Sequence, residues 1–230
     1  MTILILGCGY TGQRVASRFL AHGVEVIGTH RSWSIEDVRK QVTPGMLVLH
    51  SVPPQGTTGL LEALGDAPAK VVYLSTTGVY GDARVVDETT PPDSSHERIA
   101  EEQRTASGPW SSLILRPAAI YGPGRGIHER VRKGEPVDTG DNMVSRIHVE
   151  DLAAHVEAGL LSDVTGAYPV ADEEPCTSRE IAEFYARSLN MPLIEAGVSK
   201  IRSNRRVDGS AIRRALGIKL LYPSYRTYLG

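Results

Sequence analysis

The first twelve residues constrain the fold more than any other part of the chain. An apolar run from Ile3 to Leu6 leads into Gly7-Cys8-Gly9-Tyr10-Thr11-Gly12, and a helical pattern of apolar residues follows at once. This order of strand, glycine turn and helix is the context in which a G-x-G-x-x-G match predicts dinucleotide binding. Gly7 permits the tight turn, Gly9 lets the backbone approach a pyrophosphate, and Gly12 lets the helix pack close to the strand.

The start of this helix is the predicted diphosphate site. The first N–H groups of a helix have no partner within the helix, and they carry a partial positive charge that favours an anion. We therefore expect Tyr10 and Thr11 to contact the cofactor together with the three glycines. The alternative interpretation is a glycine-rich turn that binds no ligand.

Short apolar runs alternate with helical patterns through the first half of the chain, which is typical of a parallel sheet covered on both faces. The sequence therefore predicts an α/β fold, a doubly wound parallel-sheet Rossmann fold. Only one helix fits between the second and third strands, so we expect the usual third edge strand to be missing or vestigial. The predicted strands are 3–6, 24–28, 46–50, 70–75 and 112–116, and the predicted helices between the later strands are 34–42, 59–64 and 96–107.

The second half reads differently. Residues 122–144 hold glycines, prolines and charges with little periodicity, and the later predicted elements are a strand at 167–170 and helices at 150–161, 178–189 and 208–216. We expect Ser178 to cap the second of these helices. We predict two domains: an NAD(P)-binding core of residues 1–122, to which 144–171 return, and a small substrate-binding lobe of residues 123–143 and 172–230.

Composition narrows the class of partner. The net charge of −2 gives no electrostatic reason to bind nucleic acid or an anionic membrane. No apolar run approaches the roughly 18 residues that span a bilayer, and no signal peptide precedes the first strand. Of the two cysteines, Cys8 lies in the glycine turn, which makes a structural disulfide unexpected and favours the cytoplasm. Neither cysteine belongs to a cluster with metal-site spacing, so no metal is expected.

The end of the second strand indicates which nicotinamide cofactor binds. NAD is held through its ribose 2′-hydroxyl by an acidic residue about 20 positions after the glycines. This chain has Thr29-His30-Arg31-Ser32 there, with no carboxylate. Arg31, flanked by His30 and Ser32, suits a 2′-phosphate, so the sequence predicts NADP, with NAD second. The alternative is that Arg31 is an ordinary surface arginine.

Several further segments, in this order, resemble the extended short-chain dehydrogenase/reductases of the NAD-dependent epimerase/dehydratase group. The final segments, 204–217 and 222–225, resemble shorter members described as nucleoside-diphosphate-sugar epimerase-like, so the resemblance covers nearly the whole chain. It implies a small-molecule substrate such as a nucleotide sugar, and a homodimer is among the assemblies it implies. The earlier segments are Ser75–Gly81, Asp87–Pro91, Arg116–Gly124 and Arg146–Ala153.

The resemblance also implies site residues, and one part of the family pattern is missing. That family works with a Ser or Thr, a Tyr, and a Lys four residues after the Tyr. Thr76 matches the first position, but no tyrosine here has a lysine four residues later; Ser94 and Arg98 fall at those positions. Arg98 can bind a cofactor ribose as a fixed cation but cannot give up a proton. The other cofactor contacts that we expect are at Ser51, Val52, Ser75, Arg116 and Pro117.

The missing tyrosine leaves the proton donor open. Tyr80 is our first candidate, and its alternative is local packing. Tyr121, Arg146 and His148 are expected to bind substrate; Arg146 suits a phosphate, whereas His148 is alternatively a residue that positions the following helix. The six cations between Lys200 and Arg214 either clamp an acidic ligand or form a solvated face.

Two function classes therefore stay open. The first is an NADP-dependent epimerase, dehydratase or reductase in which Thr76 polarises the reacting oxygen and a non-standard group moves the proton. The second is a catalytically silent NAD(P)-binding sensor or interaction protein. The absent Tyr and Lys favour the second class, and the intact segments around Thr76 and Tyr121 favour the first.

Overall fold

A computed structural model describes residues 1–53, 59–196 and 204–230 of the chain. Its centre is a six-stranded sheet in the order β10-β6-β4-β3-β1-β2, in which every neighbouring pair is parallel. Each strand carries a continuous apolar run, as expected for strands covered on both faces. The bounds are β1 Thr2–Leu6, β2 Glu25–Gly28, β3 Leu47–His50, β4 Lys70–Leu74, β6 Ser111–Pro117 and β10 Gly166–Val170.

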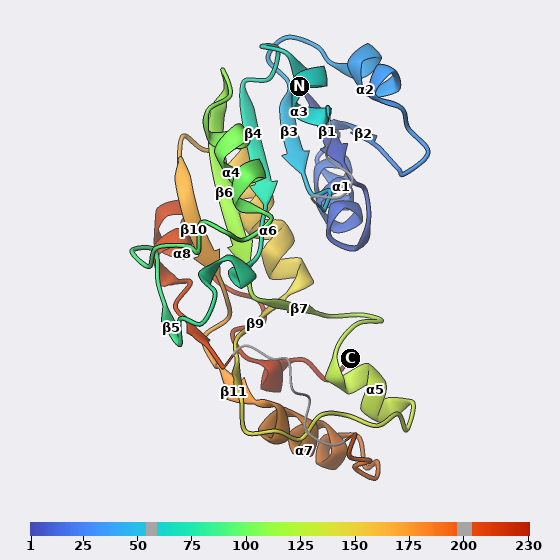
Figure 1. The fold of residues 1–230 in the computed structure, drawn as a ribbon. Helices are drawn as coiled ribbons and strands as arrows, with labels where there is room; N and C mark the ends of the chain where they lie inside the picture. The colour runs from blue at the N-terminus through green and yellow to red at the C-terminus, as the bar shows by residue number, and fades with distance from the viewer. Residues whose placement is uncertain (54–58, 197–203) are drawn as a thin grey trace.

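Helices cover both faces of this sheet (Figure 1). One apolar cluster joins the sheet to α1 (Tyr10–Ala21), α6 (Val149–Leu160) and α8 (Ser210–Leu216). A second cluster, on the opposite face, includes residues of α2 (Ile35–Gln41) and α3 (Leu60–Leu64). The α/β doubly wound prediction is confirmed.

The edge of the sheet confirms the missing strand. The chain leaves β2 through α2 and enters β3, which pairs with the other side of β1, so β2 is the last strand at that edge. The usual third strand is absent from residues 29–46, all of which are described. The strand order reverses between β1 and β3, and a reversal of this kind opens a crevice at the carboxyl ends of the strands.

Three short strand pairs and one helical pair build the lower part of Figure 1. Helix α5 (Ile127–Arg132) packs against α7 (Ser178–Ser188). Helix α8 instead packs on β10 and α6, so this part of the predicted lobe lies with the sheet. The pairs are β5 (Val85–Val86) with β12 (Arg206–Val207), β7 (Ala119–Tyr121) with β9 (Arg146–His148), and β8 (Met143–Val144) with β11 (Cys176–Thr177).

Helix caps show one wrong prediction. The expected cap of α7 was Ser178, but Thr177 caps it: the Thr177 hydroxyl accepts the N–H of Glu180 at 3.1 Å, and the Glu180 carboxylate accepts the N–H of Thr177 at 2.7 Å. The two interactions form a capping box one residue earlier than predicted. Helix α4 (Ile99–Ala106) is also shorter than expected, because residues 96–98 form turns before it.

A histidine in α6, His155, is fully buried. His155 Nδ1 is 2.7 Å from the backbone oxygen of Asp151, which only accepts, so Nδ1 carries the proton and Nε2 has no partner. Burial lowers the pKa of His155 to about 4. The folded protein therefore holds this imidazole neutral at pH values where the unfolded chain protonates it.

Replacement of His155 by Asn keeps a donor toward Asp151 and removes the titration. Because the folded pKa lies below the ordinary value, the wild-type protein loses stability as pH falls, and this group accounts for about 2 kcal/mol of the loss between pH 7.5 and 5. Urea denaturation at both pH values measures the difference. We expect His155→Asn to lose about that much less than wild type; equal losses would contradict the buried neutral imidazole.

Candidate functional site

The glycine turn between β1 and α1 is held by contacts that only glycine permits. Gly7 adopts a φ of +84°, and its N–H donates to Thr29 Oγ1 at 3.1 Å. A Cβ on Gly12 would lie 2.8 Å from the Gly7 carbonyl oxygen, so α1 approaches β1 as closely as the backbone allows. The Thr29 hydroxyl is buried and used by the turn, a role that its position at the end of β2 did not indicate.

Gly9, unlike Gly12, has open space beside its Cα. A Cβ on Gly9 would meet no atom within 4 Å, and its φ of −91° is open to any residue. No side chain caps the first turn of α1, and no acidic residue lies there. Open space above Gly9 and the uncapped N–H groups at the start of the helix together form a cradle for an anion.

A cavity of about 730 Å³ extends from this cradle along the ends of β1, β2 and β3. The structure thus brings together the predicted residues Gly7, Gly9, His30, Arg31, Ser51 and Val52. Trp33, Val38 and Leu60 supply an apolar wall that the sequence did not indicate, because they come from α2, α3 and the loop before α2. Ser32 is exposed outside this lining.

Ser51 also supports the turn itself, because its Oγ donates to the Gly7 carbonyl oxygen at 2.7 Å. Val52 Cγ2 would lie 3.0 Å from a Cβ on Gly7, so the end of β3 packs directly under the turn. Thr11 is buried in the first turn of α1. These three residues shape the cradle from behind.

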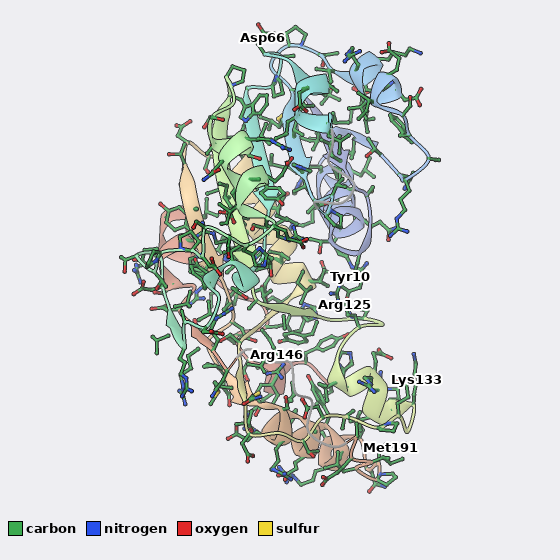
Figure 2. The ribbon with its side chains drawn as sticks, in the orientation of Figure 1. Tyr10, Asp66, Arg125, Lys133, Arg146 and Met191 are labelled. Carbon is green, nitrogen blue, oxygen red and sulfur yellow. The ribbon has the colours of Figure 1, made fainter. Side chains whose placement is uncertain are left out.

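Tyr10 joins the glycine turn to the second half of the chain. Its hydroxyl donates to the Pro123 carbonyl oxygen at 3.1 Å. The guanidinium groups of Arg14 and Arg125 lie 4.3 and 5.3 Å from its ring centroid, as cation–π contacts require. Figure 2 shows Tyr10 and Arg125 next to each other where the two parts of the molecule meet.

A buried ion network occupies two of the residues expected at the cofactor. Arg116 donates to the Glu102 carboxylate at 2.6 and 3.1 Å, and the Ser75 hydroxyl donates to the same carboxylate at 2.5 Å. Arg116 also donates to the Tyr80 hydroxyl at 3.2 Å. The structure therefore turns Ser75 and Arg116 toward α4, and Pro117 is buried at the end of β6.

Tyr80 belongs to this network rather than to an open surface. It is 3% exposed, and burial, its largest influence, raises the pKa of the phenol. A general base at neutral pH needs the opposite shift. The environment of Tyr80 therefore suits the alternative that the sequence left open, local packing.

Thr76 and Arg98 lie at the carboxyl end of β4. Thr76 is half-buried, and its Oγ1 accepts the N–H of Gly78 at 3.1 Å, which leaves its own O–H free to donate to a ligand. Arg98 donates to the Leu74 carbonyl oxygen at 3.1 Å and to the Tyr73 hydroxyl at 3.3 Å, whereas Ser94 is exposed. Arg98 is thus a fixed cation beside Thr76.

A second cavity, of about 340 Å³, lies between β7, α5 and α7. Tyr121 and Arg146, both predicted to bind substrate, line it together with Tyr185. The Tyr121 hydroxyl is buried without a hydrogen-bond partner, and burial raises the pKa of this phenol. Arg146 donates to the Val144 carbonyl oxygen at 2.9 Å, and Figure 2 labels it in the lower part of the molecule, below Tyr10 and Arg125. Further cations on the rim are Arg125, Arg130 and Lys133.

His148, also expected to bind substrate, lies outside this lining. Its ring packs 3.8 Å from the Tyr222 ring and 4.5 Å from the Tyr228 ring, measured between centroids. Its Nδ1 accepts the N–H of Glu150 at 3.3 Å, which caps α6, and burial lowers its pKa to about 4. The geometry matches the alternative interpretation, a residue that positions the following helix.

The cation cluster predicted between Lys200 and Arg214 is described only in part. Lys200 and Arg202 lie outside the described residues. Arg205 donates to the carbonyl oxygen of Ala83 at 2.9 Å, and Arg213 donates to that of Ala171 at 2.7 Å. Both are used to fasten backbone, so they do not form a clamp for a diphosphate.

Two negative findings apply to the described part of the chain alone. Within residues 1–53, 59–196 and 204–230, no group of three or more His, Cys, Asp or Glu side chains is placed to hold a metal ion. In the same ranges, no helix combines the length and the apolar character needed to cross a bilayer.

Comparison with curated proteins finds a relative named as a reductase and one whose name states no activity. The 3-diazoavenalumate denitrifying reductase of a Streptomyces species is 29% identical, over 76% of this chain and 69% of the relative. Protein YeeZ of Escherichia coli K12 is 30% identical over 70% of this chain, and the match spans only 61% of that protein's own length. No family model matches the chain.

Solved structures share the fold over almost the whole chain. A functionally unknown conserved protein from Silicibacter pomeroyi has a TM-score of 0.80 at 29% identity, covering 99% of this chain and 96% of that one. MoeE5 in complex with UDP-glucose and NAD has a TM-score of 0.83 at 19% identity, covering 100% and 96%. The Thermus thermophilus UDP-glucose 4-epimerase complex with NAD has a TM-score of 0.75 at 22% identity, covering 94% and 93%. The last two likenesses concern the fold alone.

Proposed function

We propose that this chain, a member of the NAD-dependent epimerase/dehydratase group of extended short-chain dehydrogenase/reductases, binds a nicotinamide dinucleotide and transfers a hydride to or from a small-molecule substrate. The observation that carries the proposal is the cradle above Gly9: open space, an uncapped helix start and no acidic residue in its first turn. These features fit a diphosphate, which needs N–H donors and close approach to the backbone.

The cavity beside the cradle suits the rest of such a cofactor. The N–H groups of Tyr10, Thr11 and Gly12 would hold the diphosphate, and the apolar wall formed with Trp33 and Leu60 would accept the adenine. When bound, the nicotinamide supplies the hydride donor or acceptor that no side chain offers.

NADP is the preferred form in this proposal. Arg31 and His30 are exposed at the end of β2 and line the cavity, and the described residues that line it include no carboxylate. A ribose 2′-phosphate would gain a charge-assisted hydrogen bond from Arg31, whereas the 2′-hydroxyl of NAD would lack its usual acidic partner.

The second cavity is the proposed substrate site. Its rim carries Arg125, Arg130 and Lys133, and Arg146 and the unpartnered Tyr121 hydroxyl lie deeper. The lining also holds Glu129, whose carboxylate is paired with Arg132 at 3.2 Å. Cations around an amphipathic cavity favour an anionic small molecule such as a nucleotide sugar. The neighbouring complexes with UDP-glucose and NAD, and the reductase among the curated relatives, support this substrate class and reaction type.

Thr76 is the residue proposed to contact the reacting oxygen. Its free O–H can donate to a carbonyl oxygen that becomes negative as hydride arrives, which is where a hydrogen bond strengthens most. The network of Arg116, Glu102 and Ser75 fixes Tyr80 and the start of the loop after β4, which carries Thr76.

One observation favours the second candidate, a catalytically silent NAD(P)-binding protein. Arg98, at the position of the family lysine, uses two of its donors on Leu74 and Tyr73 and cannot move a proton. Both candidates require the cofactor cradle, so cofactor binding is tested first. A cytoplasmic location and a homodimer stay predictions.

Alanine at Gly9 and at Gly12 forms a matched test of the cradle. Gly9→Ala places its methyl group in open space, so we expect unchanged stability but at least about tenfold weaker NADPH binding, because the methyl occupies the diphosphate position. Gly12→Ala meets the Gly7 oxygen at 2.8 Å and should lose about 1–3 kcal/mol of unfolding free energy. Fluorescence titration and urea denaturation measure the two quantities. Wild-type affinity in Gly9→Ala would contradict the proposed site.

Arg31→Asp tests the choice of cofactor. Aspartate removes the cation that faces the 2′-phosphate and restores an acceptor for a ribose hydroxyl, so the ratio of NADPH to NADH affinity should fall at least about tenfold. Arg39→Asp, an exposed arginine on α2 outside the cavity lining, is the control and should leave the ratio unchanged. An unchanged ratio in Arg31→Asp would assign Arg31 to the surface.

A further inference from the structure

One imidazole lies next to Thr76 and is used by none of the networks described above. His96 is half-buried in the turns before α4. Its Nδ1 accepts the backbone N–H of Arg98 at 3.2 Å, so the proton of the neutral ring is on Nε2. The backbone of α4's first residues therefore fixes both the tautomer and the direction of the ring.

Contacts around Gly78 show how close the side chains of His96 and Thr76 lie. A Cβ on Gly78 would lie 3.3 Å from His96 Nε2 and 3.5 Å from Thr76 Oγ1. Both polar atoms thus border the same small space, which exists because residue 78 has no side chain. Within the described ranges, Nε2 has no hydrogen-bond partner, so it is available to a ligand that also contacts Thr76.

We propose that neutral His96 donates a hydrogen bond from Nε2–H to the reacting oxygen of the substrate, beside the Thr76 hydroxyl. This inference rests on the proposed function. In the reducing direction the carbonyl carbon gains a hydride from the reduced dinucleotide, and the C=O π pair moves to the oxygen. The Nε2–H of His96 and the Thr76 hydroxyl stabilise the negative charge on that oxygen, which then takes a proton from solvent to give the alcohol.

Charged groups of both signs lie around His96. Asp93 lies on the same loop: its backbone oxygen accepts the N–H of His96 at 3.1 Å, and its carboxylate is attracted to the imidazolium. Arg98, next but one in sequence, opposes the positive charge, and so does Arg205, which donates to the Thr77 and Gly81 carbonyl oxygens on the facing loop.

The test follows the histidine ring signals by NMR from pH 6 to 8.5, in the full chain saturated with NADP⁺ or with NADPH. The oxidised nicotinamide ring is cationic and the reduced ring is neutral. If His96 faces the reacting ring, its pKa should be lower with NADP⁺ than with NADPH by about half a unit or more. His96→Gln identifies the signal.

His30 is the internal control, because it lines the cofactor cavity at the end of β2, on the far side of the glycine turn. Its signal should shift on addition of either form, by the same amount. If His30 shifts but His96 has the same pKa in both complexes, the inference about His96 is overturned and the proposed function stands. If neither signal changes with either dinucleotide, the proposed function itself fails, and this inference fails with it.

Discussion

The contact between Gly12 and the Gly7 carbonyl oxygen is the constraint on which the rest of the structure depends. Because no Cβ separates them, the start of α1 lies against the end of β1, and no side chain caps the first N–H groups of the helix. Any side chain at position 12 would move the helix outward and turn these groups away. The cavity along the ends of β1, β2 and β3 begins at this glycine turn, since Gly7 and Gly9 line it.

Two further sets of contacts position the proposed reaction site next to this cradle. Tyr10 connects the glycine turn to Pro123 and Arg125, so the loop that precedes α5 is fixed relative to the cofactor site. On the other side, Glu102 of α4 collects Ser75 and Arg116, which holds the loop that carries Thr76 against the sheet. Burial of a carboxylate costs free energy unless hydrogen bonds satisfy its oxygens, and Glu102 accepts three of them from Ser75 and Arg116.

The sequence predicted the sheet well because each strand is a short apolar run, separated from the next by a turn and a helical pattern. It also predicted the missing strand, because the segment between the second and third strands is long enough for one helix but not for a further strand and helix. It could not predict β7 with β9 or β8 with β11, because strands of two or three residues carry no periodicity and their partners are far apart in the chain.

The site was predicted unevenly for a related reason. Backbone-based features such as Gly7, Gly9 and Gly12 follow from the motif. The directions of side chains do not: Ser75 and Arg116 turn toward Glu102, and the Thr29 hydroxyl supports the turn. His96 reaches Thr76 only because residues 96–98 form turns where a longer helix was expected, and no residue pattern indicates that path.

A crystal structure of the protein with NADPH tests the central claim most directly. The account predicts diphosphate oxygens within hydrogen-bond distance of the N–H groups at the start of α1, directly above Gly9. A dinucleotide bound elsewhere, or a cradle closed by neighbouring side chains in crystals soaked with NADPH, would contradict it.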